Sequence, residues 1–165
     1  MPNPNGPKLG GDGDPPQILI VDDDEDLRGF AAEVLGGEGL ATLTAASAAE
    51  ARDLIDRQSF ALVLCDMRMP GESGLELLAA LREADPELAV VMISGLDDPM
   101  LARVAFDRGA CGYLVKPFRK NELLIAVEAG LHRRREEAHQ RAHELRPGRD
   151  ADDDTDANRP AASDS

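Results

Sequence analysis

The sequence predicts an α/β fold, in which a doubly wound, five-stranded parallel sheet carries helices on both faces and ends in an extended last helix. Short aliphatic runs alternate five times with amphipathic runs at helical spacing after Gln17. A βα order repeated in this way predicts parallel strands joined by crossover helices. Runs such as Ile18–Val21 are aliphatic without alternation, as expected for strands that are buried on both faces.

The five expected strands are short runs dominated by aliphatic residues, glycine and alanine, with the ordered domain beginning at Gln17. They cover Ile18–Val21, Ala41–Ala45, Ala61–Cys65, Leu88–Ile93 and Gly112–Val115.

The helices between these strands are marked by capping residues. The first carries its apolar residues from Leu27 to Leu35 and is expected to end at Gly36-Gly37. The next two open with the capping-box patterns Ser47–Glu50 and Ser73–Glu76. The fourth opens with Asp98-Pro99 and stops at Gly109, and the last begins at Asn121.

The composition limits the classes of function. Of the 165 residues 42% are hydrophobic, enough for a core, and a formal charge of −14 makes nucleic acid an unfavourable partner. Cys65 and Cys111 have apolar neighbours, so we expect two buried, reduced thiols in a reducing compartment. With no apolar run of membrane-spanning length and no signal-peptide pattern, we expect a cytoplasmic protein and no membrane partner.

The chain outside the predicted domain, 17–131, differs in composition. Residues 1–16 are rich in Pro, Gly, Asn and Asp and are expected to be a disordered arm. Residues 132–148 are expected to form a charged helical extension, and residues 149–165 an acidic disordered tail. A thin heptad stripe leaves a homodimer as an open alternative. Its members are Leu124, Leu131, Ala138 and Leu145.

Polar residues follow four of the predicted strands. Asp22-Asp23-Asp24, Asp66, Ser94 and Lys116 come directly after strands one, three, four and five. The carboxyl ends of parallel strands meet at one edge, where ligands of doubly wound sheets bind. Carboxylates that converge there repel each other and usually require a cation, and oxygen ligands suit Mg²⁺.

Each of these residues also has a simpler interpretation by itself. The Asp run can be a solvated turn or a charge cluster at a helix N-terminus, and Asp66 a turn residue. Ser94 can be an ordinary loop serine. Lys116 can be a strand-end lysine before a helix-starting proline, although a cis Lys116–Pro117 bond would fix its direction.

In combination, four segments resemble the response-regulator receiver domains of two-component signalling. They are ILIVDDDEDLR, LVLCDMRMPGESGLELL, VVMISG and GYLVKPF, and the resemblance covers about residues 17–130. It implies a flavodoxin-like (βα)5 fold with strand order 2-1-3-4-5. It also implies that Asp66 is the phosphoacceptor, becoming 4-aspartylphosphate, and that Lys116 holds a phosphoryl oxygen.

The resemblance implies roles for the remaining site residues too. Asp22, Asp23, Asp66 and the backbone carbonyl of Arg68 would hold Mg²⁺. Ser94 would be the switch hydroxyl and Tyr113 the switch aromatic. Tyr113 is otherwise a half-buried strand residue.

The mechanism that the resemblance implies is phosphoryl transfer. The donor would be a sensor histidine kinase or a phosphotransfer protein of a phosphorelay, and the altered surface (helix four, strand five and the start of helix five) would bind a downstream protein. We expect no enzyme activity beyond the protein's own phosphotransfer and dephosphorylation. No output domain is visible after residue 131, which suggests a stand-alone receiver.

Three alternatives remain open from the sequence. Asp22-Asp23-Asp24 also resembles the Asp-x-Asp nucleophile motif of haloacid-dehalogenase-type phosphatases, although Glu25 stands where that family prefers Thr or Val. The fold could serve only as a protein-binding module without phosphorylation. The basic run His132–Arg135 could contact DNA, but it is followed directly by Glu136 and Glu137.

Overall fold

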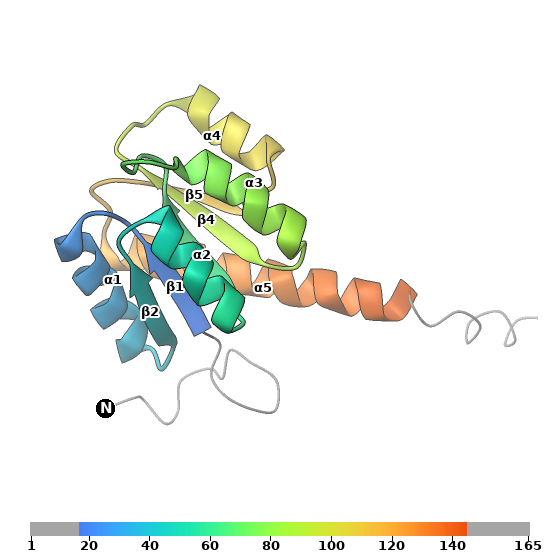
Figure 1. The fold of residues 1–165 in the computed structure, drawn as a ribbon. Coiled ribbons are helices and arrows are strands. Elements are labelled where there is room, and N and C mark those ends of the chain that lie inside the picture. Colours follow the sequence, from blue (N-terminus) through green and yellow to red (C-terminus); the bar gives the residue numbers. More distant parts are fainter. Residues whose placement is uncertain (1–16, 145–165) are drawn as a thin grey trace, which may run out of the picture.

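Five strands and five helices alternate along residues 17–144, the part of the chain that the computed structural model describes (Figure 1). The strands are β1 (Gln17–Val21), β2 (Ala41–Ala45), β3 (Leu62–Asp66), β4 (Ala89–Ser94) and β5 (Gly112–Val115). The helices are α1 (Glu25–Gly37), α2 (Ala48–Arg57), α3 (Gly74–Ala84), α4 (Pro99–Asp107) and α5 (Lys120–Glu144).

The strands form one parallel sheet in the order β2-β1-β3-β4-β5, which confirms the predicted topology. Helices α1 and α5 pack on one face of the sheet, and α2, α3 and α4 contribute to the core on the other. The strand order reverses between β1 and β3. The carboxyl ends of these two neighbouring strands therefore flank the position where doubly wound sheets bind ligands.

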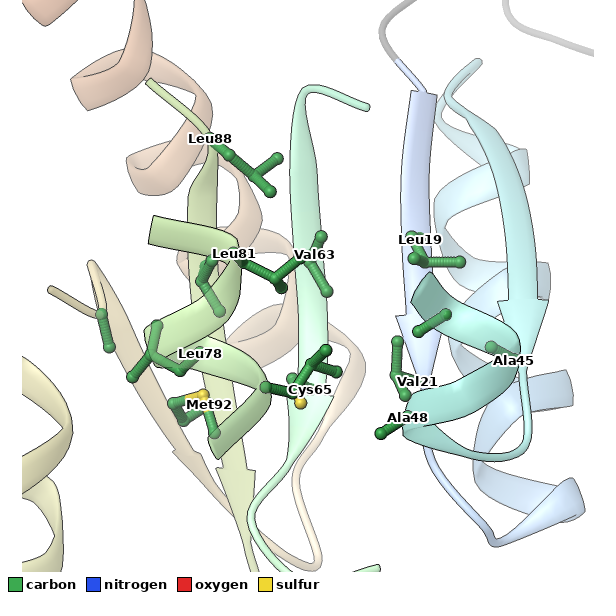
Figure 2. Packing of buried hydrophobic residues seen from close by; sticks show 14 of the residues in the cluster. Leu19, Val21, Ala45, Ala48, Val63, Cys65, Leu78, Leu81, Leu88 and Met92 are labelled. Carbon is green, nitrogen blue, oxygen red and sulfur yellow. The ribbon is translucent and has the colours of Figure 1, made fainter. Parts of the chain in front are cut away.

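Alternate strand residues supply the two halves of the core. Leu19, Val63 and Met92 belong to the cluster on the α2, α3 and α4 side, whereas Ile20 and Leu64 belong to the cluster under α1 and α5. Figure 2 shows Leu78 and Leu81 of α3 lying over Val63, Cys65 and Met92 in the first cluster. Because both faces of the central strands are covered, these strands read as uninterrupted aliphatic runs.

Strands β3 and β4 each lie one residue further along the chain than predicted, whereas β2 and β5 have the predicted bounds. The pairing continues through Asp66, which lies opposite Ile93, and the Lys116 amide donates to the Ser94 carbonyl at 2.7 Å. Asp66 and Ser94 are therefore the last residues of their strands, and ladder hydrogen bonds fix their backbone positions.

The two predicted capping boxes form to different extents. At α3, Ser73 Oγ accepts from the Glu76 amide at 3.3 Å, and the Glu76 carboxylate accepts from the Ser73 amide at 3.4 Å. At α2, Ser47 Oγ accepts from the Glu50 amide at 3.2 Å, but the Glu50 carboxylate accepts from the Ala46 amide. Only the box at α3 is therefore reciprocal.

Helix α1 ends at Gly37, within the predicted pair Gly36-Gly37, but its cap differs from the expectation. The helix runs through Gly36 and Gly37, Glu38 is its C-cap, and Gly39 takes the left-handed conformation with φ of 82°. The predicted end of the helix is therefore confirmed, but neither of these glycines is the C-cap, because the residue with positive φ lies just beyond the helix. The predicted stop of α4 is confirmed by Gly109, with φ of 101°.

Helix α5 extends well past the sheet, as Figure 1 shows in orange. Its buried residues include Leu123, Val127 and Leu131, which pack inside the domain. Leu131 is only 4% exposed, so this member of the heptad stripe is not available to a partner helix. The helix continues to Glu144; residues 145–148 of the predicted extension, including Leu145, lie outside the described residues.

Both cysteines are free thiols, but only Cys65 is fully buried. Cys111 is half-buried because it begins the turn into β5 at the rim of the sheet, which corrects the expectation of two buried thiols. Among residues 17–144, none of the helices combines the length and apolar character that crossing a bilayer requires. The predicted arm 1–16 and acidic tail 149–165 lie outside the described residues.

Candidate functional site

The predicted polar residues meet at the carboxyl edge of the sheet. Asp22 follows β1, Asp66 ends β3, Ser94 ends β4 and Lys116 follows β5. Asp22, Asp66 and Ser94 are at most 4% exposed. Within residues 17–144 they are the residues with a polar or charged side chain that are buried. Burying polar groups is costly unless they are paired, so the contacts among these residues determine what the site can do.

Lys116 connects the two buried carboxylates. Its Nζ lies 2.9 Å from Asp22 Oδ2 and 3.3 Å from Asp66 Oδ2. Burial by itself lowers the pKa of Lys116, but the hydrogen bond and charge of Asp22, together with those of Asp66, outweigh it and raise the pKa. The two carboxylates therefore keep the ammonium charged between them. The Lys116–Pro117 bond is cis, as the sequence allowed.

Asp66 carries the most perturbed carboxyl group of the site. Burial raises its pKa to about 6, and the charge of Asp22 adds to the effect. The Arg68 amide, which donates to Asp66 Oδ1 at 3.2 Å, and the charge of Lys116 act in the opposite direction. At neutral pH the group is mostly an ionised carboxylate with little solvation, a state that favours a nucleophile or a metal ligand.

The acidic loop after β1 divides its residues between two tasks. Asp22 Oδ1 accepts from the Asp24 amide at 2.9 Å, which orients the buried carboxylate. Asp23 is exposed at the mouth of the site. Asp24 caps α1 by accepting from the Asp26 amide at 3.0 Å, so it serves the helix rather than acid/base chemistry as the phosphatase interpretation would require.

The carboxylates fit a divalent cation with a preference for oxygen ligands. Asp22, Asp23 and Asp66 each place one oxygen within 4.8 Å of the others. Asp22 Oδ2 is buried, and apart from its ion pair with Lys116 it accepts no well-aligned hydrogen bond from the described residues. Three converging carboxylates and one lysine leave a net negative charge, which a small cation such as Mg²⁺ would neutralise. Arg68 reaches the site through its amide.

Ser94 and Tyr113 meet at the loop that follows β4. Ser94 Oγ accepts from the Leu96 amide at 3.1 Å, and the Tyr113 hydroxyl donates to the Leu96 carbonyl at 2.9 Å. Tyr113 is half-buried and packs against the α2, α3 and α4 side of the core. One loop residue thus connects the site hydroxyl to the aromatic ring of β5.

Two residues that support the site were missed by the sequence reasoning. Arg28 Nη1 donates to the Asp22 carbonyl at 2.7 Å and so pins the acidic loop to α1. At Gly74, an added Cβ would lie 2.0 Å from the Asp66 carbonyl oxygen, so only glycine lets α3 begin so close to the end of β3. A glycine directly after an N-cap serine was a signal for Gly74; Arg28 had none, because its contact depends on how the loop folds.

The sequence model of the response regulator receiver domain matches residues 18–128. The chain belongs to the response regulator receiver family. This receiver is 30% identical to the CheY-like receiver domain protein of Methanospirillum hungatei JF-1, with a TM-score of 0.70 over 74% of this chain and 98% of that one. For the NtrX receiver domain of Brucella abortus the identity is 38% and the TM-score 0.67, over 70% and 98% of the two chains.

In two curated relatives, the region that is similar to this receiver is part of a longer protein. Protein PetR of Rhodobacter capsulatus is 37% identical over 121 residues, which are 72% of this chain and 50% of that protein. The C4-dicarboxylate transport transcriptional regulatory protein DctD of Pseudomonas aeruginosa is 40% identical over 122 residues, 72% of this chain and 26% of that protein. The chain thus spans half or less of the full length of these relatives.

Proposed function

We propose that this receiver accepts a phosphoryl group on Asp66 from a phosphohistidine, carried by a sensor histidine kinase or a phosphotransfer protein. The observation that carries the proposal is the setting of Asp66. Its carboxylate is buried at the switch point of the sheet, bonded by the Arg68 amide at 3.2 Å and flanked by Lys116 Nζ at 3.3 Å. A phosphoryl group arriving there meets a nucleophile and a cation together.

The transfer exchanges one bond for another. An Asp66 carboxylate oxygen attacks phosphorus in line, the phosphorus–nitrogen bond of the phosphohistidine breaks, and its electron pair returns to the imidazole. Lys116 neutralises charge on the phosphoryl oxygens, and Asp22, Asp23, Asp66 and the Arg68 carbonyl would hold Mg²⁺. When bound, Mg²⁺ would supply further charge stabilisation at the phosphoryl oxygens. We predict that the side chains of Arg68 and Leu96 would flank the path of the water that later hydrolyses the 4-aspartylphosphate.

The new phosphate would be sensed by Ser94 and Tyr113. The modification adds up to about two negative charges and three acceptor oxygens. Ser94, which accepts from the Leu96 amide at 3.1 Å in this structure, would turn its hydroxyl to a phosphate oxygen. Tyr113 would then leave the Leu96 carbonyl and move inward, which shifts a pre-existing equilibrium at α4, β5 and the start of α5. That surface exposes Met100 and Phe106 to a downstream protein.

The experiment is phosphorylation of the full chain with acetyl phosphate, read by intact mass, with and without Mg²⁺. We expect one added phosphoryl group that requires Mg²⁺ and is absent in Asp66→Asn. Asp53→Asn is the matched control, because it makes the same chemical change on the exposed face of α2 and should leave labelling unchanged. If a control receiver is labelled under conditions in which this chain is not, the fold is a binding module without a phosphoswitch.

A further inference from the structure

A second polar site lies at the opposite edge of the sheet, away from Asp66. A pocket of about 50 Å³ opens beside the beginnings of β4 and β5. Its walls come from the end of α3, the α3–β4 turn, the α4–β5 loop and the second half of α5. Three arginines line it: Arg82 on α3, and Arg133 and Arg134 on α5.

Two glycines keep the pocket open. At Gly130 an added Cβ would lie 2.7 Å from Leu62 Cδ1 and 3.2 Å from Cys111 Sγ. Gly109 has φ of 101°, and its Cβ would lie 2.8 Å from Arg82 Nε. A side chain at either position would fill or displace the wall, so the pocket depends on the absence of side chains at these two points.

Two carboxylates, Glu87 and Glu137, also line the pocket, and both already have partners. Glu137 accepts from Arg133 Nε at 3.2 Å, and Glu87 lies 3.6 Å from Arg141. Arg82 is anchored through Nη1 to the carbonyls of Pro86 and Leu88, which fixes its position and leaves its charge uncompensated. Within residues 17–144, neither Arg82 nor Arg134 has a carboxylate within ion-pair distance.

Arg134 adds a separate observation. Its Nε is buried, and no described residue accepts a hydrogen bond from it. Buried donors in native proteins are almost always paired with protein, water or a ligand, so this N–H indicates an acceptor supplied from outside the described chain.

We propose that this pocket is a second ligand site, which binds a phosphate-class oxyanion between Arg82, Arg133 and Arg134. The planar guanidinium group matches the oxygens of phosphate through paired N–H donors. Several guanidiniums exceed what a single carboxylate can satisfy, whereas a phosphate offers three or four oxygens and up to two charges. The pocket has room for one such group, with any organic part of the ligand left in solvent.

The test is a titration of the full chain with inorganic phosphate, followed by amide NMR in magnesium-free buffer at constant ionic strength. We expect saturable shifts of the Gly109, Cys111 and Gly130 amides, with no comparable shifts beside Asp66. The acidic edge repels phosphate when Mg²⁺ is absent, so this result does not depend on the proposed phosphoacceptor function.

A pair of neighbouring substitutions separates the pocket from general attraction to basic residues. Arg134→Gln should weaken phosphate binding by about 10-fold or more, because it removes a charge-assisted donor of the site. Arg135→Gln makes the same charge change at an exposed position outside the pocket and should alter binding by less than about 2-fold. Arg133→Gln serves as the second pocket variant if Arg134→Gln shifts the unfolding midpoint.

Further ligands identify the source of the phosphate. Phenyl phosphate binding much more tightly than inorganic phosphate would assign a phosphate monoester, and equal binding would assign free phosphate; both support the site. Acetate binding as tightly as phosphate overturns the phosphate assignment. The proposal also fails if the pocket amides do not shift, or if Arg134→Gln and Arg135→Gln weaken binding equally.

Discussion

The two edges of the sheet carry opposite chemistry. At the carboxyl edge, Asp22 and Asp66 are buried around one lysine, and at the amino edge Arg82 and Arg134 surround a small pocket. The helices run antiparallel to the strands, so their positive N-termini lie near the acidic edge, and Arg82 stands in the last turn of α3, near a negative C-terminus. The fold thus favours anionic side chains at one end and cationic side chains at the other.

The glycines at the two edges allow the sharpest stability comparison. Gly74→Ala should destabilise the protein by about 3 kcal/mol, because the new Cβ meets rigid backbone of Asp66 at 2.0 Å. Gly130→Ala should cost less, about 1–2 kcal/mol, because its nearest atom is the end of the Leu62 side chain.

Gly29→Ala is the control for these substitutions, since an added Cβ has no atom within 4 Å in helix α1. It should be neutral or stabilise by up to about 1 kcal/mol. Urea unfolding measures all three changes. A larger loss for Gly130→Ala than for Gly74→Ala would mean that the amino edge is the more rigid of the two.

Removing the positive charge of Lys116 should leave the repulsion between the Asp22 and Asp66 carboxylates uncompensated. Lys116→Gln should destabilise the metal-free protein by about 2 kcal/mol at neutral pH, because two buried carboxylates lose their shared partner. Mg²⁺ should restore more of the midpoint in this variant than in wild type. Lys120→Gln, at an exposed position of α5, is the control and should change the thermal midpoint little.

The same carboxylates make stability depend on pH. The pKa of Asp66 is about 6 in the folded state, above its usual 3.8, so its ionisation favours unfolding. The associated stability is present below about pH 4 and is lost as the pH rises through about 6. Without metal, Asp66→Asn should therefore stabilise the protein by about 1–2 kcal/mol near pH 8 and by little near pH 4. Denaturant midpoints across this range test it, and an equal gain at both ends would contradict the assignment.

The smallest effects concern exposed ion pairs at the two edges. Arg52 of α2 pairs with Glu72 in the loop after Asp66, with Nε 2.9 Å from Oε2, and Arg141 lies 3.6 Å from Glu87. Arg52→Gln should cost at most about 0.5 kcal/mol and Arg141→Gln less, because exposed pairs are screened by solvent and salt. Unfolding at low and at high salt measures both losses. A loss for Arg52→Gln that is independent of salt would indicate a packing contribution and not an electrostatic one.

For the long helix α5, the sequence predicted the helical extension correctly but did not predict what its apolar residues contact. Its helical character past Leu131 follows from the run of charged residues with good helix propensity. The heptad stripe suggested a partner helix, but Leu131 is buried in its own domain. A stripe shows which residues are apolar and not what covers them, so the homodimer remains a prediction without support from this residue.

The sequence by itself determined the five βα units and the residues of the acidic edge, and its resemblance to the receiver family implied the strand order. Aliphatic runs and caps are local signals, and the residue that ends a parallel strand must lie at the carboxyl edge. Only the tertiary structure decided that Asp24 caps α1, that Arg28 holds the Asp22 carbonyl, and that Arg82 and Arg134 line one pocket. These contacts join elements distant along the chain or depend on loop geometry, and neither hydrophobic period nor spacing encodes such distances.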